Sequence, residues 1–248
     1  AKEYGAKVLA VCNTNSSTIP RESDAVIYTH AGPEIAVAST KALLTQIVAT
    51  YLIGLHLGEV RGVLKSKAVS EIYNEMLELP AKLEQILETV EPLRALTRKF
   101  ADKNTVLFLG RHVGFPVALE GALKLKELAY IHAEGFAGGE LKHGPIALIE
   151  EGTLVIAIVP NTHEHGLDEK MLSNIQEVCA RGAKVIAIAA EGIEIPGATH
   201  VIRIPDSPQL LQPVLATVPL QVFAYEMACA RGTDVDQPRN LAKSVTVE

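Results

Sequence analysis

The sequence predicts an α/β fold of two doubly wound, mostly parallel sheets, the first of them incomplete. Apolar strands alternate with helical stretches along the chain, which is typical of parallel sheets covered by helices. A strand–strand–helix order occurs twice with similar spacing, and the second copy is preceded by elements that the first copy lacks. In such folds, ligands are expected at the carboxyl ends of the strands.

The first copy of the repeat lies near the N-terminal end of the chain. Its elements are predicted from apolar runs and from the glycines that end helices. They are, in order, a helix end at Gly5, a buried strand at 6–11, a short strand at 25–29 and a long helix that ends at Gly58.

The long helix contains the longest apolar segment of the chain, residues 42–57. Ser39 and Thr40, in front of it, are typical N-cap residues. Polar side chains interrupt the segment, so it predicts a core helix rather than a membrane span. These side chains are Thr45, Gln46, Thr50 and His56.

The second copy begins at Gly182, where GAKVIAI repeats the GAKVLAV that starts at Gly5. The next strand starts at His200, 18 residues after Gly182, against 20 residues in the first copy. The helix that follows ends at Gly232, 32 residues after His200, against 33 in the first copy. This spacing predicts two related α/β halves.

The second half carries a strand at 105–110, a helix, a strand at 154–159 and another helix in front of Gly182. The first half has no counterpart, so we expect roughly 80 to 100 residues to be missing from a longer protein. A naturally short, asymmetric pair of domains is the alternative. Helical spacing with breaks at Pro80 and Pro92 predicts connecting helices between the halves. The predicted organisation is a first partial domain at 1–62, a helical linker at 63–100, a second domain at 101–233 and a C-terminal tail at 234–248.

The stretch 119–145 combines ionisable side chains with small residues. Its first half predicts a helix, and its second half, 135–145, holds four glycines and His143, which predicts a loop that approaches another group. A Glu–Lys pair that only stabilises the helix, and a histidine that only bonds the loop backbone, are the structural alternatives. At about 100° per residue, four side chains share roughly 80° of the helix surface: Glu120, Lys124, Glu127 and Glu134.

The composition is that of an ordinary soluble protein, with 48% hydrophobic and 21% charged residues among 248. A net charge of −6 disfavours nucleic acid or an anionic membrane as a partner. The turn after residues 105–110 lacks a G-x-G-x-x-G pattern, so no dinucleotide is expected, and we expect no other cofactor and no metal. The cysteines lack metal-binding or redox spacing, which predicts reduced, buried thiols in a cytoplasmic protein: Cys12, Cys179 and Cys229.

Four runs of sequence identify a family resemblance that covers essentially the whole chain. They are AGPEIAVASTK at 31–41, LEGALKLK at 119–126, YIHAEGFAGGELKHGP at 130–145 and DVDQPRNLAKSVTVE at 234–248. The chain closely resembles the isomerase region of the glutamine–fructose-6-phosphate aminotransferase family, which consists of two SIS (sugar isomerase) domains. This agrees with the internal repeat.

The resemblance implies roles for individual side chains. Glu127 would be the general base that moves a proton between C1 and C2 of the sugar, and Lys124 would stabilise the oxyanion that develops. Lys243 would form a Schiff base with the open-chain ketose, although by position alone a lysine near a C-terminus is most often solvated. His143 would open the sugar ring in the active site of the neighbouring subunit, which implies a homodimer. Contacts to the sugar are implied for Val37, Ser39 and Ala242.

The implied function of the parent enzyme is to make glucosamine 6-phosphate from fructose 6-phosphate and glutamine. This region would isomerise the ketose to the aldose. The family's phosphate-binding turns and its glutaminase domain have no counterpart here, so we expect the chain alone to have little or no activity. The alternatives are another SIS sugar-phosphate isomerase or deglycase, which the run at 234–248 disfavours, and a non-catalytic SIS module, which would lack the Lys124 and Glu127 pair.

Overall fold

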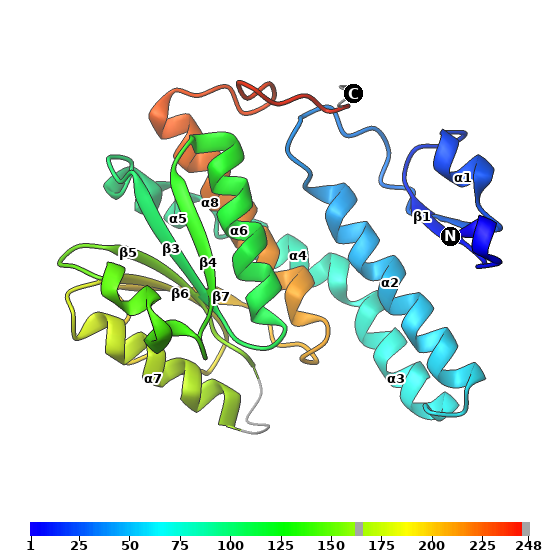
Figure 1. The fold of residues 1–248 in the computed structure, drawn as a ribbon. Coiled ribbons are helices and arrows are strands. Elements are labelled where there is room, and N and C mark those ends of the chain that lie inside the picture. Colours follow the sequence, from blue (N-terminus) through cyan, green and yellow to red (C-terminus); the bar gives the residue numbers. More distant parts are fainter. Residues whose placement is uncertain (162–165, 245–248) are drawn as a thin grey trace. The chain divides into compact units, whose positions relative to one another are not determined.

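The computed structural model describes residues 1–161 and 166–244, which divide into two compact units (Figure 1). The first unit consists of residues 1–73 and the tail from Ala242, and the second consists of residues 74–241. Each unit contains a parallel sheet and helices, which confirms the predicted α/β class.

The first unit has a two-stranded parallel sheet. Strand β1 (Leu9–Cys12) pairs with β2 (Ala25–Tyr28), with Leu9 opposite Ala25, and the short helix α1 (Thr18–Glu22) connects them. Gly5 adopts a left-handed conformation with φ of 78° and ends a 3₁₀ turn at Lys2–Tyr4, so the predicted helix end lies where expected. The first strand is shorter than predicted.

Helix α2 (Lys41–Val60) follows, and the prediction that it ends at Gly58 was wrong. The helix continues past Gly58 because the chain reverses only at Gly62, where φ is 68°. The amides of Val63 and Leu64 then donate back to the carbonyl of Gly58. A Cβ at Gly58 would lie 2.7 Å from the Leu64 side chain, so this glycine permits a close approach rather than a helix end.

Burial separates α2 from its counterpart α8 (Gln212–Arg231) in the second unit. By length and composition alone, both helices could span a membrane. However, 72% of the most apolar 18-residue stretch of α8 is buried, against 11% of that of α2. The prediction that α2 is a buried core helix was therefore wrong, because a two-stranded sheet offers the helix little surface to pack against. The buried residues of α2 are Ala42, Ala49 and Leu55.

Three helices occupy the stretch where connecting helices were predicted. Pro80 and Pro92 lie in the first turns of two of them, where a missing backbone N–H breaks no helical hydrogen bond. The helices are α3 (Ser66–Leu77), α4 (Leu79–Leu87) and α5 (Val90–Lys99), and both α4 and α5 pack against α8.

The second unit is built on a five-stranded parallel sheet with strand order β4-β3-β5-β6-β7 (Figure 1). Helix α7 (Leu167–Cys179) covers one face, and α6 (Gly114–Ala129) lies on the other face together with α8. The central strands are almost entirely buried, as expected for a sheet covered on both faces. The strands are β3 (Thr105–Gly110), β4 (His132–Ala137), β5 (Leu154–Ile158), β6 (Lys184–Ala190) and β7 (His200–Ile204).

Strand β4 was not predicted, and its presence corrects the expected position of Glu134. Helix α6 ends at Ala129, and Tyr130 takes a left-handed conformation with φ of 55° that turns the chain into β4. Glu134 is therefore an exposed residue of an edge strand and does not share the helical face of Lys124. Gly135 lies against α6, since a Cβ there would be 3.1 Å from the Leu119 backbone.

The cysteines are free thiols, in line with the sequence, but the expectation that all are buried was wrong. Cys12 and Cys179 are half-buried. Cys229, in the last turn of α8, is exposed.

Gly121 allows α6 to fit between the sheet and α8, and we expect its replacement to be destabilising. A Cβ at Gly121 would lie 2.8 Å from both Phe108 of β3 and Leu220 of α8. Gly121→Ala should therefore lower the free energy of unfolding by about 1–3 kcal/mol, measured by urea denaturation. The matched control is Gly54→Ala in α2, where no atom lies within 4 Å. There alanine should stabilise by roughly 0.5–1 kcal/mol, and an equal gain at both sites would contradict the packing argument.

Candidate functional site

Helix α6 carries a group of three charged side chains. The Nζ of Lys124 lies 2.5 Å from Glu127 Oε2 and 3.4 Å from Glu120 Oε1. The Lys124 side chain is only 3% exposed, whereas both glutamates are partly open to solvent. The ammonium therefore lies between two carboxylates at the border of the protein interior.

The packing of α6 explains why Lys124 is buried. Gly121, Leu125 and Leu128 on the same helix are buried, and Gly121 contacts both β3 and α8. An unpaired ammonium in this position would cost several kcal/mol, so the two carboxylates compensate its burial.

Glu120 has the perturbed acidity in this group. Burial raises the pKa of Glu120, and the charge of Glu127 raises it further, while Lys124 opposes both. Glu120 therefore binds a proton at a higher pH than an ordinary glutamate. A lysine donor beside two carboxylates is an arrangement suited to general acid–base chemistry.

The group does not lie at the carboxyl ends of the strands, where ligands were expected. Lys124 lies ten residues after the start of α6, about 15 Å along the helix at 1.5 Å per residue. Other polar groups gather at the strand ends, where Arg111 Nε donates to Asn174 Oδ1 over 3.0 Å. A polar cavity of about 510 Å³ there is lined by Glu75, Lys82, Asn161, Asp206, Ser207, Pro208 and Gln209.

His143 lies in an exposed segment after β4. Its Nδ1 is 2.8 Å from Glu140 Oε2, and 72% of its side chain is exposed. The preceding Leu141 is buried in the core, and Gly144 has φ of 141°, so the segment is anchored on one side of the histidine and turns sharply on the other. Within the described residues, no hydrogen bond or ion pair joins His143 to the Lys124 group.

A second group of predicted residues meets in the first unit, around Glu34. The Nζ of Lys243 lies 2.9 Å from Glu34 Oε2 and 3.5 Å from the carbonyl of Val37. The hydroxyl of Ser39 donates to the same Glu34 oxygen over 3.1 Å. Ala242 precedes Lys243 and is exposed. The structure thus brings Val37, Ser39 and Lys243 together.

Glu34 was missed by the sequence reasoning, although it lies in the AGPEIAVASTK run. Burial alone would favour its neutral acid. The hydrogen bonds from Lys243 and from the backbone amides of Thr40 and Ala42 outweigh burial and lower the pKa of Glu34 to about 2. An acidic residue three positions before Val37 and close to a predicted helix start was the available signal.

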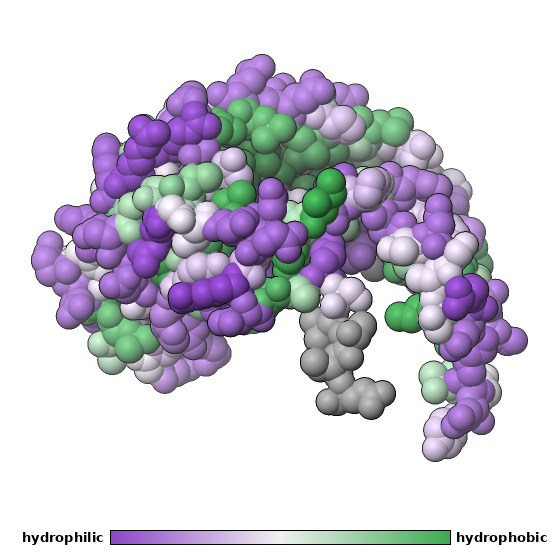
Figure 2. Space-filling model, turned by 90° about the horizontal axis from the view of Figure 1, so that it is seen from above, coloured by the Kyte–Doolittle hydropathy of each residue, from purple (hydrophilic) through white to green (hydrophobic). Residues whose placement is uncertain are grey.

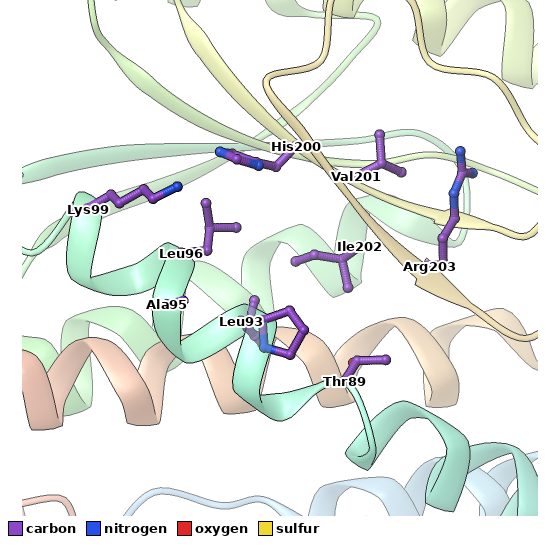
Figure 3. A pocket seen from close by; sticks show the side chains of 10 residues that line it. Thr89, Leu93, Ala95, Leu96, Lys99, His200, Val201, Ile202 and Arg203 are labelled. Atoms are coloured by element: carbon purple, nitrogen blue, oxygen red, sulfur yellow. The ribbon is translucent and has the colours of Figure 1, made fainter.

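An apolar cavity of about 330 Å³ lies between α5 and the edge strand β7 (Figure 3). Leu93, Leu96 and Ile202 form much of its wall, with Lys99 and His200 toward one end (Figure 3). It contains none of the predicted site residues. In the described part of the chain, no cluster of three or more metal-ligating side chains occurs.

Comparison with known proteins agrees with the resemblance found in the sequence. The family model described as SIS domain matches residues 1–55 and 99–231. The glutamine–fructose-6-phosphate aminotransferase [isomerizing] of Streptomyces coelicolor is 64% identical over 251 aligned residues, covering 100% of this chain and 41% of that protein. The Corynebacterium diphtheriae protein of the same name is 63% identical, with 100% and 40% covered. The chain therefore spans about 40% of the length of these curated relatives.

Solved structures give the same result. The C-terminal domain of glucosamine-fructose-6-phosphate aminotransferase from Francisella tularensis superimposes with a TM-score of 0.88 at 39% identity, covering 92% of this chain and 64% of that one. A structure from Clostridium difficile, with a TM-score of 0.80 at 19% identity and covering 96% of this chain and 66% of that one, shows the fold alone.

Replacing Lys124 tests the charge compensation on α6. Lys124→Met would leave two neighbouring carboxylates without their cation, and we expect the free energy of unfolding to fall by about 3 kcal/mol at pH 7. Lys126→Met on the same helix is the matched control, because Lys126 is exposed, and it should change stability by less than about 0.5 kcal/mol. Equal effects of the two variants in urea denaturation would argue against the compensation.

The pKa of Glu34 predicts a pH-dependent contribution to stability. A carboxyl whose pKa is lowered from 4.5 to about 2 stabilises the fold above pH 4.5, and this contribution is lost as the pH falls through 2. Glu34→Gln should therefore destabilise by on the order of 2 kcal/mol between pH 5 and 7 and progressively less below pH 4.5. Urea denaturation at several pH values measures this, and Glu59→Gln at an exposed position of α2 is the control. A loss that is independent of pH would contradict the assignment.

Proposed function

The chain belongs to the SIS domain family, and we propose that it acts as the isomerase region of an enzyme that makes glucosamine 6-phosphate from fructose 6-phosphate and glutamine. One observation carries the proposal: the match to relatives named glutamine–fructose-6-phosphate aminotransferase covers the whole chain at 64% identity. A different SIS isomerase, a deglycase or a non-catalytic sugar-phosphate module is less well supported by these relatives.

The proposed chemistry uses the charged group on α6. After amination at C2, Glu127 takes a proton from C1 and returns it to C2, which converts the ketose skeleton into the aldose. Lys124, 2.5 Å from Glu127, supplies a fixed positive charge to the oxygen on which negative charge develops. Burial of Lys124 supports this role, since a desolvated, held ammonium needs little reorganisation during the reaction.

The group in the first unit supplies the proposed covalent step. Lys243 is 40% exposed and therefore accessible to a sugar, and it lies beside Val37 and Ser39. In this proposal its amine attacks the C2 carbonyl of the open-chain ketose, and water leaves as the Schiff base forms. Ser39, Val37 and Ala242 contact the sugar.

We further propose that the enzyme is a cytoplasmic homodimer in which His143 opens the sugar ring in the partner's site. The exposure of His143 supports this arrangement. The exposed leucines Leu119 and Leu123 on α6, 44% and 41% exposed, also support a dimer, because exposed apolar side chains are suited to an interface. Figure 2 shows that hydrophobic side chains form patches among polar ones on one face of the molecule. A glutaminase domain is the proposed source of the nitrogen in the complete protein.

Replacing the proposed base tests the function. In a complete enzyme that contains this region, Glu127→Gln should slow the interconversion of fructose 6-phosphate and glucose 6-phosphate by about 10²–10⁴-fold. Glu134→Gln is the control, because Glu134 is exposed on an edge strand, and it should retain activity within about twofold.

Isomerisation that survives in Glu127→Gln would exclude Glu127 as the base. The 248-residue chain alone is expected to show little or no turnover in the same assay. Turnover comparable to that of an intact isomerase region would contradict this expectation.

A further inference from the structure

Glu34 is the centre of a hydrogen-bond network that links three separate parts of the first unit. One carboxylate oxygen accepts the amides of Thr40 and Ala42, at 2.8 and 3.2 Å, where helix α2 begins. The other oxygen accepts Ser39 Oγ and Lys243 Nζ, at 3.1 and 2.9 Å. The side chain is 8% exposed, so it is almost fully enclosed by these partners.

The charges in this network compensate one another. The amides of the first turn of a helix have no acceptor within the helix, and at the start of α2 Glu34 accepts two of them beside the positive end of the helix dipole. Lys243 adds the one full positive charge that the network contains among the described residues. Because the helix holds the carboxylate in place, the carboxylate provides a fixed anchor for the C-terminal tail.

We infer that Glu34 is a positioning residue for Lys243, which it holds against the turn of Val37 and Ser39 through the Glu34–Lys243 ion pair. The inference builds on the catalytic role proposed above for Lys243. Glu34 itself contacts no reacting atom in this arrangement. It sets the position of the Lys243 amine before the sugar binds.

The pairing also defines the resting state of the amine. An ammonium has no lone pair, so Lys243 must release a proton before its nitrogen can attack the C2 carbonyl. Glu34 is too weak a base to take that proton, which therefore passes to solvent when the sugar draws Lys243 away from the carboxylate. The nitrogen then bonds to C2, and the carbonyl oxygen leaves as water.

The inference is tested by the rate at which chymotrypsin cleaves the 248-residue chain after Leu241, an exposed tail residue next to Ala242, measured by mass spectrometry. Glu34→Gln should increase the rate of this cleavage at least about tenfold, as expected for loss of a charged hydrogen bond that holds the tail. Lys243→Arg retains the positive charge and should keep most of the protection. Glu59→Gln, on an exposed position of the same unit, should match the unmodified chain.

A double-mutant cycle separates positioning from helix capping. Lys243→Met leaves the contacts of Glu34 with α2 in place and should release the tail by itself, so the test remains available if Glu34→Gln fails to fold. If the ion pair holds the tail, Glu34→Gln combined with Lys243→Met should expose it no more than either change alone. An unchanged rate of tail cleavage in Lys243→Met, or strictly additive effects, would overturn the inference.

The catalytic role is tested separately. Fructose 6-phosphate and borohydride should produce a reduced adduct on Lys243 of a complete enzyme, and Lys243→Arg should abolish it. Absence of the adduct alongside a tail held by Glu34 would reject the Schiff-base role of Lys243. An adduct that forms in Glu34→Gln at the unmodified rate and affinity would reject positioning by Glu34.

Discussion

The burial of Lys124 between Glu120 and Glu127 is the interaction on which the second unit's candidate chemistry depends. An ammonium that is only 3% exposed is stable only when nearby carboxylates compensate its charge. Here both carboxylates lie one helical turn from Lys124 on the same helix, Glu120 before it and Glu127 after it. That helix can lie this deep because Gly121 lets it approach Phe108 and Leu220 closely. Side-chain chemistry and backbone packing are therefore linked at α6, and a change in either affects the other.

Helices α2 and α8 show how surroundings determine the fate of similar sequences. Both follow the second strand of a repeated strand–strand–helix unit, and both are 20 residues long. Helix α8 lies on a five-stranded sheet among α4, α5 and α6 and is largely buried, whereas α2 accompanies a two-stranded sheet and is largely exposed. The repeat in the sequence predicts the order of the elements but not the area that each helix buries.

The sequence predicted those features that depend on local pattern. The apolar runs placed most strands, and glycines placed the turns at Gly5 and Gly232, because φ near 70–80° strongly favours glycine. Predictions from the sequence failed where contacts between distant parts of the chain determine the structure. The run of residues 132–137 becomes β4 only because β3 lies beside it, with Glu134 opposite Leu107. Glu34 shows its importance only when Lys243, 209 residues away, reaches its carboxylate.

The two units treat their glutamates in opposite ways, and the difference has a physical basis. Glu34 is enclosed by donors, namely two backbone amides, a hydroxyl and an ammonium, so its charge is satisfied and its pKa falls. Glu120 is enclosed without comparable donors and shares its one cation with Glu127, so its pKa rises. A permanently ionised carboxylate is suited to holding a lysine in place. A carboxyl group whose pKa is raised, as that of Glu120 is, binds a proton more readily, and sites whose environments separate the acidities of their carboxyl groups in this way can divide binding from proton transfer.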